Sequence, residues 1–326
     1  MLPASFAVLL AGAYFFTNAV EWAGHRLGLG EGAVGSLLAA VGTALPESII
    51  PVIALITGGQ ADDVAVGAIL GAPFMLATIA MALVGVSAFV FRKRRPQGVA
   101  IRVHLATTVR DLCFFLAFFA VALALGFGAP KPLRVAVAVA FVLAYAVYAR
   151  LTLRRGGGVQ EAASLKPLYL DATRDDPPGN GTIALQLLVA LGAIVGGSHL
   201  FVDELLHVAD RVGVSALVLA LVLAPLATEL PEKANSFLWT REGKDTLALG
   251  NITGAMVFQS TLPVGLGLAF TDWTLRGPSA LAAALGLAGG ALALVLLRVR
   301  GRFDPVGILA WAGLYTAFVV YVVVAA

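Results

Sequence analysis

The residues of this chain best suited to chemistry are two glutamates, each following a leucine-proline pair inside a long apolar stretch. The motifs are Leu45-Pro46-Glu47 and Leu230-Pro231-Glu232. In a membrane a carboxylate away from the interface costs roughly 2.5 to 3.5 kcal/mol, and a proline frees a backbone carbonyl. Carboxylates and freed carbonyls are the oxygen ligands that a hard cation such as Ca²⁺ or Na⁺ requires. The motifs therefore predict an ion site formed by Glu47 and Glu232.

Each glutamate has a threonine four residues before it, Thr43 before Glu47 and Thr228 before Glu232. Four residues are about one helical turn, so we expect each threonine and its glutamate to share one helical face. Their hydroxyl and carbonyl oxygens could complete the coordination of a cation. The alternative is that each hydroxyl only bonds its own helix.

The second motif carries two further charges. Glu229 stands where Ala44 stands in the first motif, and Lys233 follows Glu229 by four residues, a spacing that favours an ion pair on a helix. A sharper hypothesis is that Lys233 holds a fixed positive charge near the site and reduces the number of cations bound there. Gln259 offers a neutral oxygen in reach of Glu232 if their helices pack; an interhelical hydrogen bond is the alternative.

The composition indicates the elements that must position these residues. Hydrophobic residues make up 60% of the 326 residues and charged residues 13%, which predicts a polytopic, all-α membrane protein. The single cysteine, Cys113, excludes an intrachain disulfide and a thiolate cluster. With about 20 apolar residues per crossing we expect ten transmembrane helices. They cover residues 2–20, 33–57, 63–91, 103–126, 132–150, 182–205, 213–239, 246–270, 278–298 and 305–325.

The only long polar stretch separates the fifth span from the sixth. We therefore expect a first five-helix unit at residues 1–150, a linker at 151–181 and a second five-helix unit at 182–326. With the N-terminus outside, sixteen Lys and Arg residues fall on inner loops and four on outer loops. The positive-inside rule then predicts a cell-membrane protein with both termini outside and the linker in the cytoplasm. We interpret the basic clusters as topology signals and not as a nucleic-acid surface.

The two halves are related in sequence. One constant offset, without a gap, aligns identical or similar residues over a long segment: Gly12 with Gly197, Asn18 with Asp203, Thr43 with Thr228 and Glu47 with Glu232. Because each half has an odd number of spans, the second copy enters the membrane from the opposite side, so we expect two inverted five-helix repeats. In such proteins the bound ion lies at the repeat interface near the membrane midplane.

A second pair of matching segments follows the motifs. Gly67–Ala72 aligns with Gly250–Ala255 at nearly the same offset. Each segment holds two glycines four residues apart, a spacing that lets helix backbones approach closely. The segments therefore predict close helix packing beside each Leu-Pro-Glu motif.

Two Leu-Pro-Glu motifs, each followed by a glycine-rich segment, in a ten-span inverted repeat resemble the cation/Ca²⁺ exchanger superfamily, and most closely the prokaryotic sodium/calcium exchangers. The resemblance covers essentially the whole chain. It implies that spans two, three, seven and eight form a core and that spans one and six slide across it. It also implies that Glu47 and Glu232 are the central ion-binding glutamates and that Thr43 and Thr228 are ligands.

Several positions depart from that family's pattern. Ala44 and Glu229 replace a serine of Thr-Ser-Leu-Pro-Glu, and Leu76 and Gln259 stand where a polar or acidic side chain normally joins the site. Three alanines stand in place of an asparagine and two serines: Ala68, Ala72 and Ala255. Fewer hydroxyls should weaken separate sodium sites before they abolish the divalent site. Proton coupling needs only that Glu47 or Glu232 be protonated when the divalent ion leaves.

The sequence thus predicts a secondary antiporter that exchanges Ca²⁺ or a related cation for Na⁺ or H⁺ by alternating access. Its ligands are inorganic cations, with Glu47 and Glu232 first and Thr43, Thr228, Gln259 and Glu229 as further candidates. We expect no cofactor, no enzymatic activity and a functional monomer. The alternative is an uncoupled transporter-like channel or cation sensor; an intramembrane enzyme is disfavoured because no nucleophile and base stand at a suitable spacing.

Overall fold

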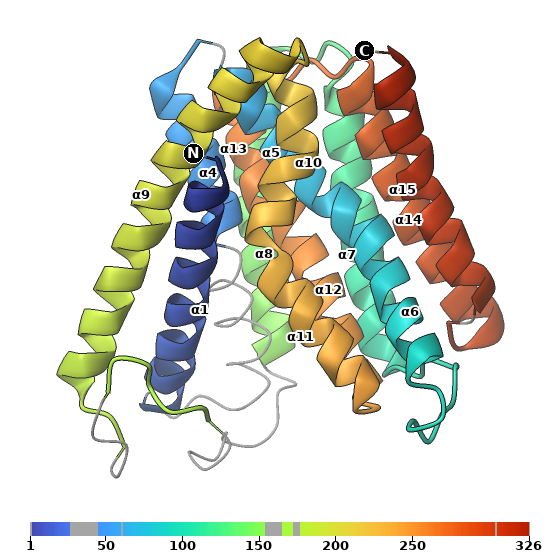
Figure 1. The fold of residues 1–326 in the computed structure, drawn as a ribbon. Helices are drawn as coiled ribbons and strands as arrows, with labels where there is room; N and C mark the ends of the chain where they lie inside the picture. The colour runs from blue at the N-terminus through green and yellow to red at the C-terminus, as the bar shows by residue number, and fades with distance from the viewer. Residues whose placement is uncertain are drawn as a thin grey trace.

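The chain folds into a bundle of helices (Figure 1). The computed structural model describes residues 2–26, 45–59, 61–153, 165–171, 177–303 and 305–325. Within these ranges some residues are described by their backbone alone: Leu45, Pro46, Leu153, Ala227, Leu230, Pro231, Glu232, Ala234, Asn235, Pro305, Val306 and Ala325. Within these ranges no strand forms beyond an isolated bridge between Ile101 and Phe303. The predicted all-α class is confirmed.

Eight helical stretches of the described residues are long and apolar enough to cross a membrane. Two of these stretches, Ala61–Val90 and Asp245–Phe270, contain more than one helix. The helices in chain order are α1 (Leu2–Arg26), α4 (Leu45–Thr57), α5 (Ala61–Met75), the π-helical turn η2 (Leu76–Ala80), α6 (Met81–Val90), α7 (Leu105–Leu125), α8 (Lys131–Leu153), α9 (Asn180–Val212), α10 (Ala216–Thr228), α11 (Leu230–Arg241), α12 (Asp245–Gln259), α13 (Leu262–Phe270), α14 (Pro278–Arg300) and α15 (Pro305–Ala325).

The seventh predicted span, residues 213–239, is two helices and not one. Helix α10 ends at Thr228 and α11 begins at Leu230, with Glu229 (φ −92°, ψ 4°) between them. Pro231 lies in the first turn of α11, the one place where its missing N–H and fixed φ are tolerated. Thr228 and Glu232 therefore lie on successive helices, and because the side chain of Glu232 lies outside the described residues, the expectation that the two share one face stays a prediction.

The third span of each half is also irregular, at matching positions. In the first half the π-helical turn η2 interrupts the stretch from α5 to α6. In the second half the chain breaks between α12 and α13, at Ser260 and Thr261. Leu76 and Gln259, which match when the two glycine segments are aligned, lie at these two interruptions. Such irregular turns leave backbone groups outside the regular helical pattern, as often happens near functional sites.

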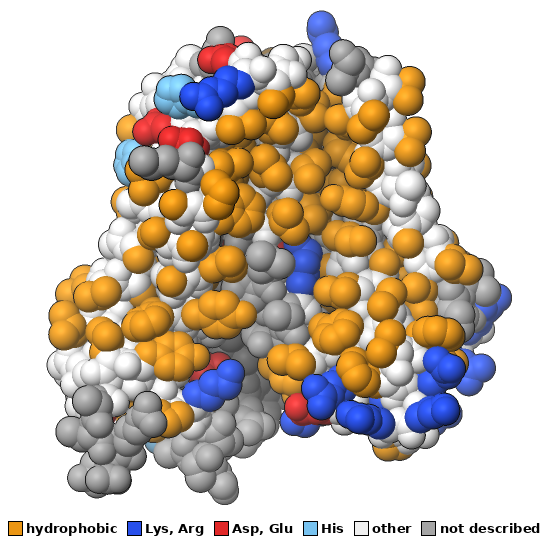
Figure 2. Space-filling model, in the orientation of Figure 1, with side chains coloured by type: hydrophobic (Ala, Val, Ile, Leu, Met, Phe, Trp, Pro, Cys, Tyr) orange, Lys and Arg blue, Asp and Glu red, His pale blue; other side chains and the backbone are white. Residues whose placement is uncertain are grey.

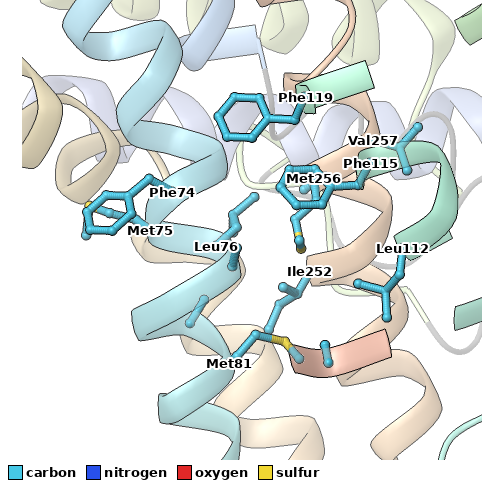
Figure 3. Close-up of a cluster of buried hydrophobic side chains, with 14 of the residues drawn as sticks. Phe74, Met75, Leu76, Met81, Leu112, Phe115, Phe119, Ile252, Met256 and Val257 are labelled. Carbon is cyan, nitrogen blue, oxygen red and sulfur yellow. The ribbon is translucent and has the colours of Figure 1, made fainter. Parts of the chain in front are cut away.

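The largest apolar core lies between the third span of the first half and α7 and α12 (Figure 3). Phe74, Phe115 and Met256 from three different helices are almost completely buried there. The side-chain rings of Phe115 and Phe119 stack along α7, with 5.3 Å between the ring centroids. Leu76 is fully buried in this core. The position where the resemblance leads one to expect a polar or acidic side chain is therefore used here for apolar packing.

Helices α1 and α9 pack against each other along their length, at one side of the bundle (Figure 1). A Cβ at Gly12 would lie 2.9 Å from Ile194 Cγ1, and a Cβ at Gly197 would lie 3.1 Å from Leu9 Cγ. Gly12 matches Gly197, and Leu9 matches Ile194, in the alignment of the two halves. This reciprocity is what an inverted repeat requires of its first helices.

Close packing of glycines also joins the two halves in the middle of the bundle. A Cβ at Gly67 of α5 would lie 2.5 Å from Leu217 O, and one at Gly71 would overlap Leu221 O. The predicted close approach is thus confirmed for the first glycine pair, whose partner is α10. At Gly250 no atom of the described residues lies within 4 Å of that position, and at Gly254 the nearest is Tyr148 Oη at 3.9 Å.

On the face shown in Figure 2, apolar side chains cover most of the middle, and most of the charged side chains gather at the two ends. Both termini lie toward one end, while the described linker residues lie toward the other (Figure 1). Helix α9 has 33 residues, eight more than α1. At 1.5 Å per residue it is about 50 Å long, more than a hydrocarbon core of about 30 Å, so it must tilt or protrude.

The linker segment Leu165–Asp171 is held between α1 and α9 by two buried amides. Asn18 accepts a hydrogen bond from Tyr169 N (3.1 Å), and Gln186 accepts one from Leu170 N (2.9 Å). Gln186 Nε2 also donates to Asn18 Oδ1 at 3.0 Å, which links the two helices directly. The indole of Trp22 adds a donor to Lys166 O at 2.9 Å. Because every one of these contacts is to α1 or α9, this part of the linker belongs to the α1/α9 pair.

A buried ion pair joins the two halves near the connection between α11 and α12. Arg95, in the turn after α6, donates to both carboxylate oxygens of Asp245 at 2.8 and 3.0 Å and also to Thr240 O. Asp245 in turn accepts from Arg102 N at 2.9 Å. The side chains of Arg95 and Asp245 are 0% and 1% exposed. Arg95 is thus more than one of the basic topology signals, because it joins the turn after α6 to the α11–α12 connection.

Candidate ion-binding site

Glu47 lies in a pocket between the two halves of the chain. It stands in the first turn of α4, and its side chain is only 5% exposed. Ala68 and Ala72 of α5 line one wall of the pocket, and Pro225 and Thr228 of α10 line the other. The space that remains is too narrow for a water-sized sphere. A carboxylate of the first half therefore faces the end of α10 in the second half.

The wall formed by α5 has no oxygen ligands in its side chains. Ala68 and Ala72 stand at the family's asparagine and serine positions and present methyl groups to the pocket. The opposite wall is more polar. Thr228 is the last residue of α10, and its hydroxyl donates to Ala224 O at 3.1 Å, which leaves the lone pairs of the oxygen available to a cation.

The carbonyl end of α10 holds the predicted ion pair. Lys233 Nζ lies 2.7 Å from Glu229 Oε2 and 3.4 Å from Pro225 O. Glu229 is 0% and Lys233 6% exposed. The i,i+4 ion pair expected from the sequence is confirmed. It lies beside the Glu47 pocket, because Pro225 lines that pocket and also accepts from Lys233.

Gln259 lies beside Glu229. Its amide approaches the Glu229 carboxylate from the end of α12, and it is 2% exposed. Helix α12 is joined to α11 by a second polar contact, in which Asn251 Nδ2 donates to Ser236 Oγ at 3.2 Å. The second half therefore gathers Thr228, Glu229 and Gln259 at one helix break.

Two predicted ligands cannot be placed. Thr43 and the side chain of Glu232 lie outside the described residues, although the backbone of Glu232 lies in the first turn of α11. Of the six predicted ligands, Glu47 and Thr228 share a pocket, and Glu229 and Gln259 adjoin it.

A polar network that the sequence did not predict supports α12 from behind. Asp111 of α7 accepts hydrogen bonds from Tyr148 Oη and Thr253 Oγ1, both at 3.1 Å, and from Arg110 at 2.9 Å. The guanidinium of Arg110 also lies 5.2 Å from the centre of the Tyr148 ring. Arg110 and Asp111 are neighbours in sequence, so their pairing could not be inferred from helical spacing. The network holds α7, α8 and α12 together near the segment that carries Gln259.

This geometry has the features of an ion carrier. A buried carboxylate, a helix carbonyl end and a hydroxyl meet at the contact between two related halves, and oxygen is the ligand element throughout. The fold is also that of cation exchangers. The crystal structure of the H⁺/Ca²⁺ exchanger CAX superposes with a TM-score of 0.75 at 20% identity, covering 99% of this chain and 85% of that chain. A structure of the sodium-calcium exchanger NCX_Mj gives a TM-score of 0.62 at 18% identity, covering 97% and 95%.

The family follows from the sequence comparisons. The model of the sodium/calcium exchanger protein family matches residues 1–154 and 182–324, so the chain belongs to this family. Among curated proteins, the putative antiporter CaxA of Alkalimonas amylolytica is 25% identical over 300 residues, which are 91% of this chain and 88% of CaxA. The chain is thus a multi-pass membrane protein of a cation antiporter family. Its substrates are inorganic cations, and the family uses no bound cofactor.

Proposed function

We propose that this protein is a secondary active antiporter that exchanges Ca²⁺, or a related hard divalent cation, for Na⁺ or H⁺ by alternating access. The observation that carries the proposal is the pocket in which Glu47 of the first half faces Pro225 and Thr228 of the second. A carboxylate and oxygen ligands at a helix end suit a hard cation. Glu232, in the first turn of α11, supplies the second carboxylate in this proposal, and Thr43 supplies a further oxygen.

The pocket between the halves also supports alternating access. Its described lining leaves no room for a water-sized sphere, and we infer that the surrounding helices move when an ion binds or leaves. The α1/α9 pair is the element proposed to move. Helices α1 and α9 contact each other more extensively than either of them contacts α4 or α10. The core of α4, α5, α10, α11 and α12 holds the ion while that pair exposes it to one side of the membrane and then to the other.

The membrane orientation is proposed from the basic residues. The turn after α6 and the linker, both rich in Lys and Arg, lie in the cytoplasm, and both termini lie outside the cell membrane. Cysteine labelling tests this orientation in a Cys113→Ser background. Lys93→Cys in the turn after α6 should react with a charged maleimide only after the membrane is opened, and Phe127→Cys between α7 and α8 should react in intact cells. The opposite pattern would reverse the orientation.

Ion flux tests the transport proposal. The experiment measures ⁴⁵Ca²⁺ uptake into proteoliposomes under an imposed Na⁺ gradient or an imposed pH gradient. Uptake should respond to one of these gradients and fall at least about thirtyfold in Glu47→Gln and in Glu232→Gln, because each variant loses a charged ligand. Glu242→Gln is the matched control, since the Glu242 side chain is exposed and forms a surface ion pair with Lys244.

The gradient that drives uptake identifies the coupling ion. Flux that follows neither gradient but still depends on Glu47 would support an uncoupled channel and contradict an exchanger. Flux that is unchanged in both glutamate variants would contradict the proposed site. We further propose that one chain is a complete transport unit, because both carboxylates belong to the same chain. Undiminished flux in liposomes that contain a single chain each is the expected result.

A further inference from the structure

The inference concerns the buried lysine beside the ion pocket. Lys233 and Glu229 are 7% and 1% exposed in their side chains, whereas the surface pair Lys244 and Glu242 is 55% and 53% exposed. The N–O distance is 2.7 Å in both pairs. A buried ion pair loses its hydration, and this cost offsets most of the attraction between the two charges. Net stability therefore does not explain why this pair is buried.

The surroundings of the Lys233 ammonium are those of a bound monovalent cation. Its Nζ contacts one carboxylate oxygen, from Glu229, and one backbone carbonyl, from Pro225. Pro225 lies in the last turn of α10, where the helix dipole concentrates partial negative charge. In transporters with broken helices, such half-helix carbonyl ends are places where Na⁺ is coordinated.

The second carboxylate oxygen of Glu229 is also buried. No hydrogen bond to Glu229 Oε1 of ordinary geometry is formed among the described residues, although the Gln259 amide approaches the carboxylate. A buried acceptor without a donor is costly, and a cation satisfies several such oxygens at once. The Lys233 ammonium therefore lies against carboxylate and carbonyl oxygens, as a bound cation would.

We propose that Lys233 is a tethered cation: its ammonium occupies a position that would otherwise bind an exchanged monovalent ion such as Na⁺. This inference rests on the proposed function, since it assigns one coupling-ion position of that antiporter. The Glu229–Lys233 pair is neutral as a unit and needs no ion from solution. The exchanger consequently carries one monovalent ion fewer per cycle than the same site without the lysine. The first half has no such device, because Ala44 and Ser48 stand at the matching positions.

The test is a gain of sodium binding when the lysine is removed. Thermal unfolding of the purified, detergent-solubilised full chain is measured in NaCl and in choline chloride at equal ionic strength. Lys233→Met keeps the length of the side chain and removes its charge, so Glu229 must find another cation. We expect Na⁺ to raise the midpoint of Lys233→Met by roughly 2 °C or more beyond its effect on the wild type. An equal response of the two proteins would overturn the inference.

Two control variants separate a tethered cation from a general loss of stability. Glu229→Gln combined with Lys233→Met removes the whole pair, and its sodium response should equal that of the wild type. Lys244→Met removes a surface lysine and should also leave the response unchanged. If Lys233→Met fails to fold in choline chloride, recovery in NaCl supports the inference. Failure in both salts, with the double variant folded, contradicts it.

The sodium response of unfolding and the ⁴⁵Ca²⁺ flux test the tethered cation and the antiport function separately. A sodium response gained in Lys233→Met together with no ⁴⁵Ca²⁺ flux in the wild type would refute the antiport function and keep the cation position. Flux that depends on Glu47 with no gained response would refute the tethered cation and keep the antiporter. In a functional exchanger, Lys233→Met should also add one positive charge to the Na⁺-coupled transport cycle, measured as a shift in the reversal potential.

Discussion

The second spans of the two halves begin a helix in the same way and differ in the charges around it. Both α4 and α11 start with Leu-Pro-Glu, and a glutamate stands in the first turn of each. In the second half the residues on either side of that motif form the buried Glu229–Lys233 pair, and the matching residues of the first half are Ala44 and Ser48. The Leu-Pro-Glu motif thus stands at the start of a helix in both halves, whereas the added charged pair is present in the second half alone. The two halves therefore share the motif and differ in the charges beside it.

The same contrast appears at the start of the third spans, and it gives the largest expected effect on stability. Asp245 in the first turn of α12 is buried against Arg95, while the matching Asp62 in the first turn of α5 is exposed. Asp245→Asn should lower the free energy of unfolding by about 3 kcal/mol, because it leaves the Arg95 charge buried without its partner. Asp62→Asn should leave it almost unchanged.

Equilibrium unfolding in mixtures of a mild detergent and SDS measures both variants. Equal losses of stability would mean that the ion pair adds nothing beyond an ordinary helix start. Replacing both Arg95 and Asp245 with Met tests the cause, since a neutral and well-packed pair should recover much of the loss.

The glycine pairs give the next effect. Gly71→Ala should cost about 1–3 kcal/mol, because the added methyl overlaps Leu221 O and lies close to Pro225 Cγ. Gly254→Ala, at the matching position, should have almost no effect, since its nearest described neighbour is Tyr148 Oη at 3.9 Å. An equal loss of unfolding free energy in Gly254→Ala and Gly71→Ala, measured in the same assay, would contradict this difference between the two glycine pairs. Because Pro225 lines the Glu47 pocket, Gly71→Ala should also slow ion uptake.

The smallest effect distinguishes the first helices of the two halves. Asn18 is buried and bonds Leu165–Asp171, whereas Asp203, its counterpart, is exposed on α9. Asn18→Ala should cost about 1–2 kcal/mol, because Tyr169 N and Gln186 Nε2 lose an acceptor. Hydrogen exchange should then rise at Tyr169 and Leu170, with little change in the core. Asp203→Ala is the control, and equal exchange in the two variants would show that the amide does not hold the linker.

How far the sequence could predict this molecule depends on the range of each interaction. The all-α class, the apolar stretches and the Glu229–Lys233 pair follow from periodicity and from a spacing of four residues, which are local properties. The division of the seventh span was within reach, because Pro231 cannot lie inside a continuous helix without loss. Treating Thr228 and Glu232 as residues of one helix ignored that constraint.

The contacts that the sequence could not predict join residues more than a hundred positions apart. Arg95 was counted as a topology signal, and only the fold brings it to Asp245. The link from Asp111 to Thr253 and the link from Asn18 to the linker have no local signature either. Gln259 is expected in reach of Glu232, which stays a prediction, and its observed approach to Glu229 depends on how α12 meets the break after α10. The repeat showed which residues correspond, and packing decided what each of them does.

The linker attachment has a mechanical consequence. Asn18, Trp22 and Gln186 anchor Leu165–Asp171 to both α1 and α9, and Arg26 adds bonds to Pro177 and Pro178 just before α9 begins. The segment links the two helices, so under the proposed alternating access we expect a displacement of one helix along its axis to move the other as well. This attachment lies at the end of the bundle where the described linker residues are found (Figure 1).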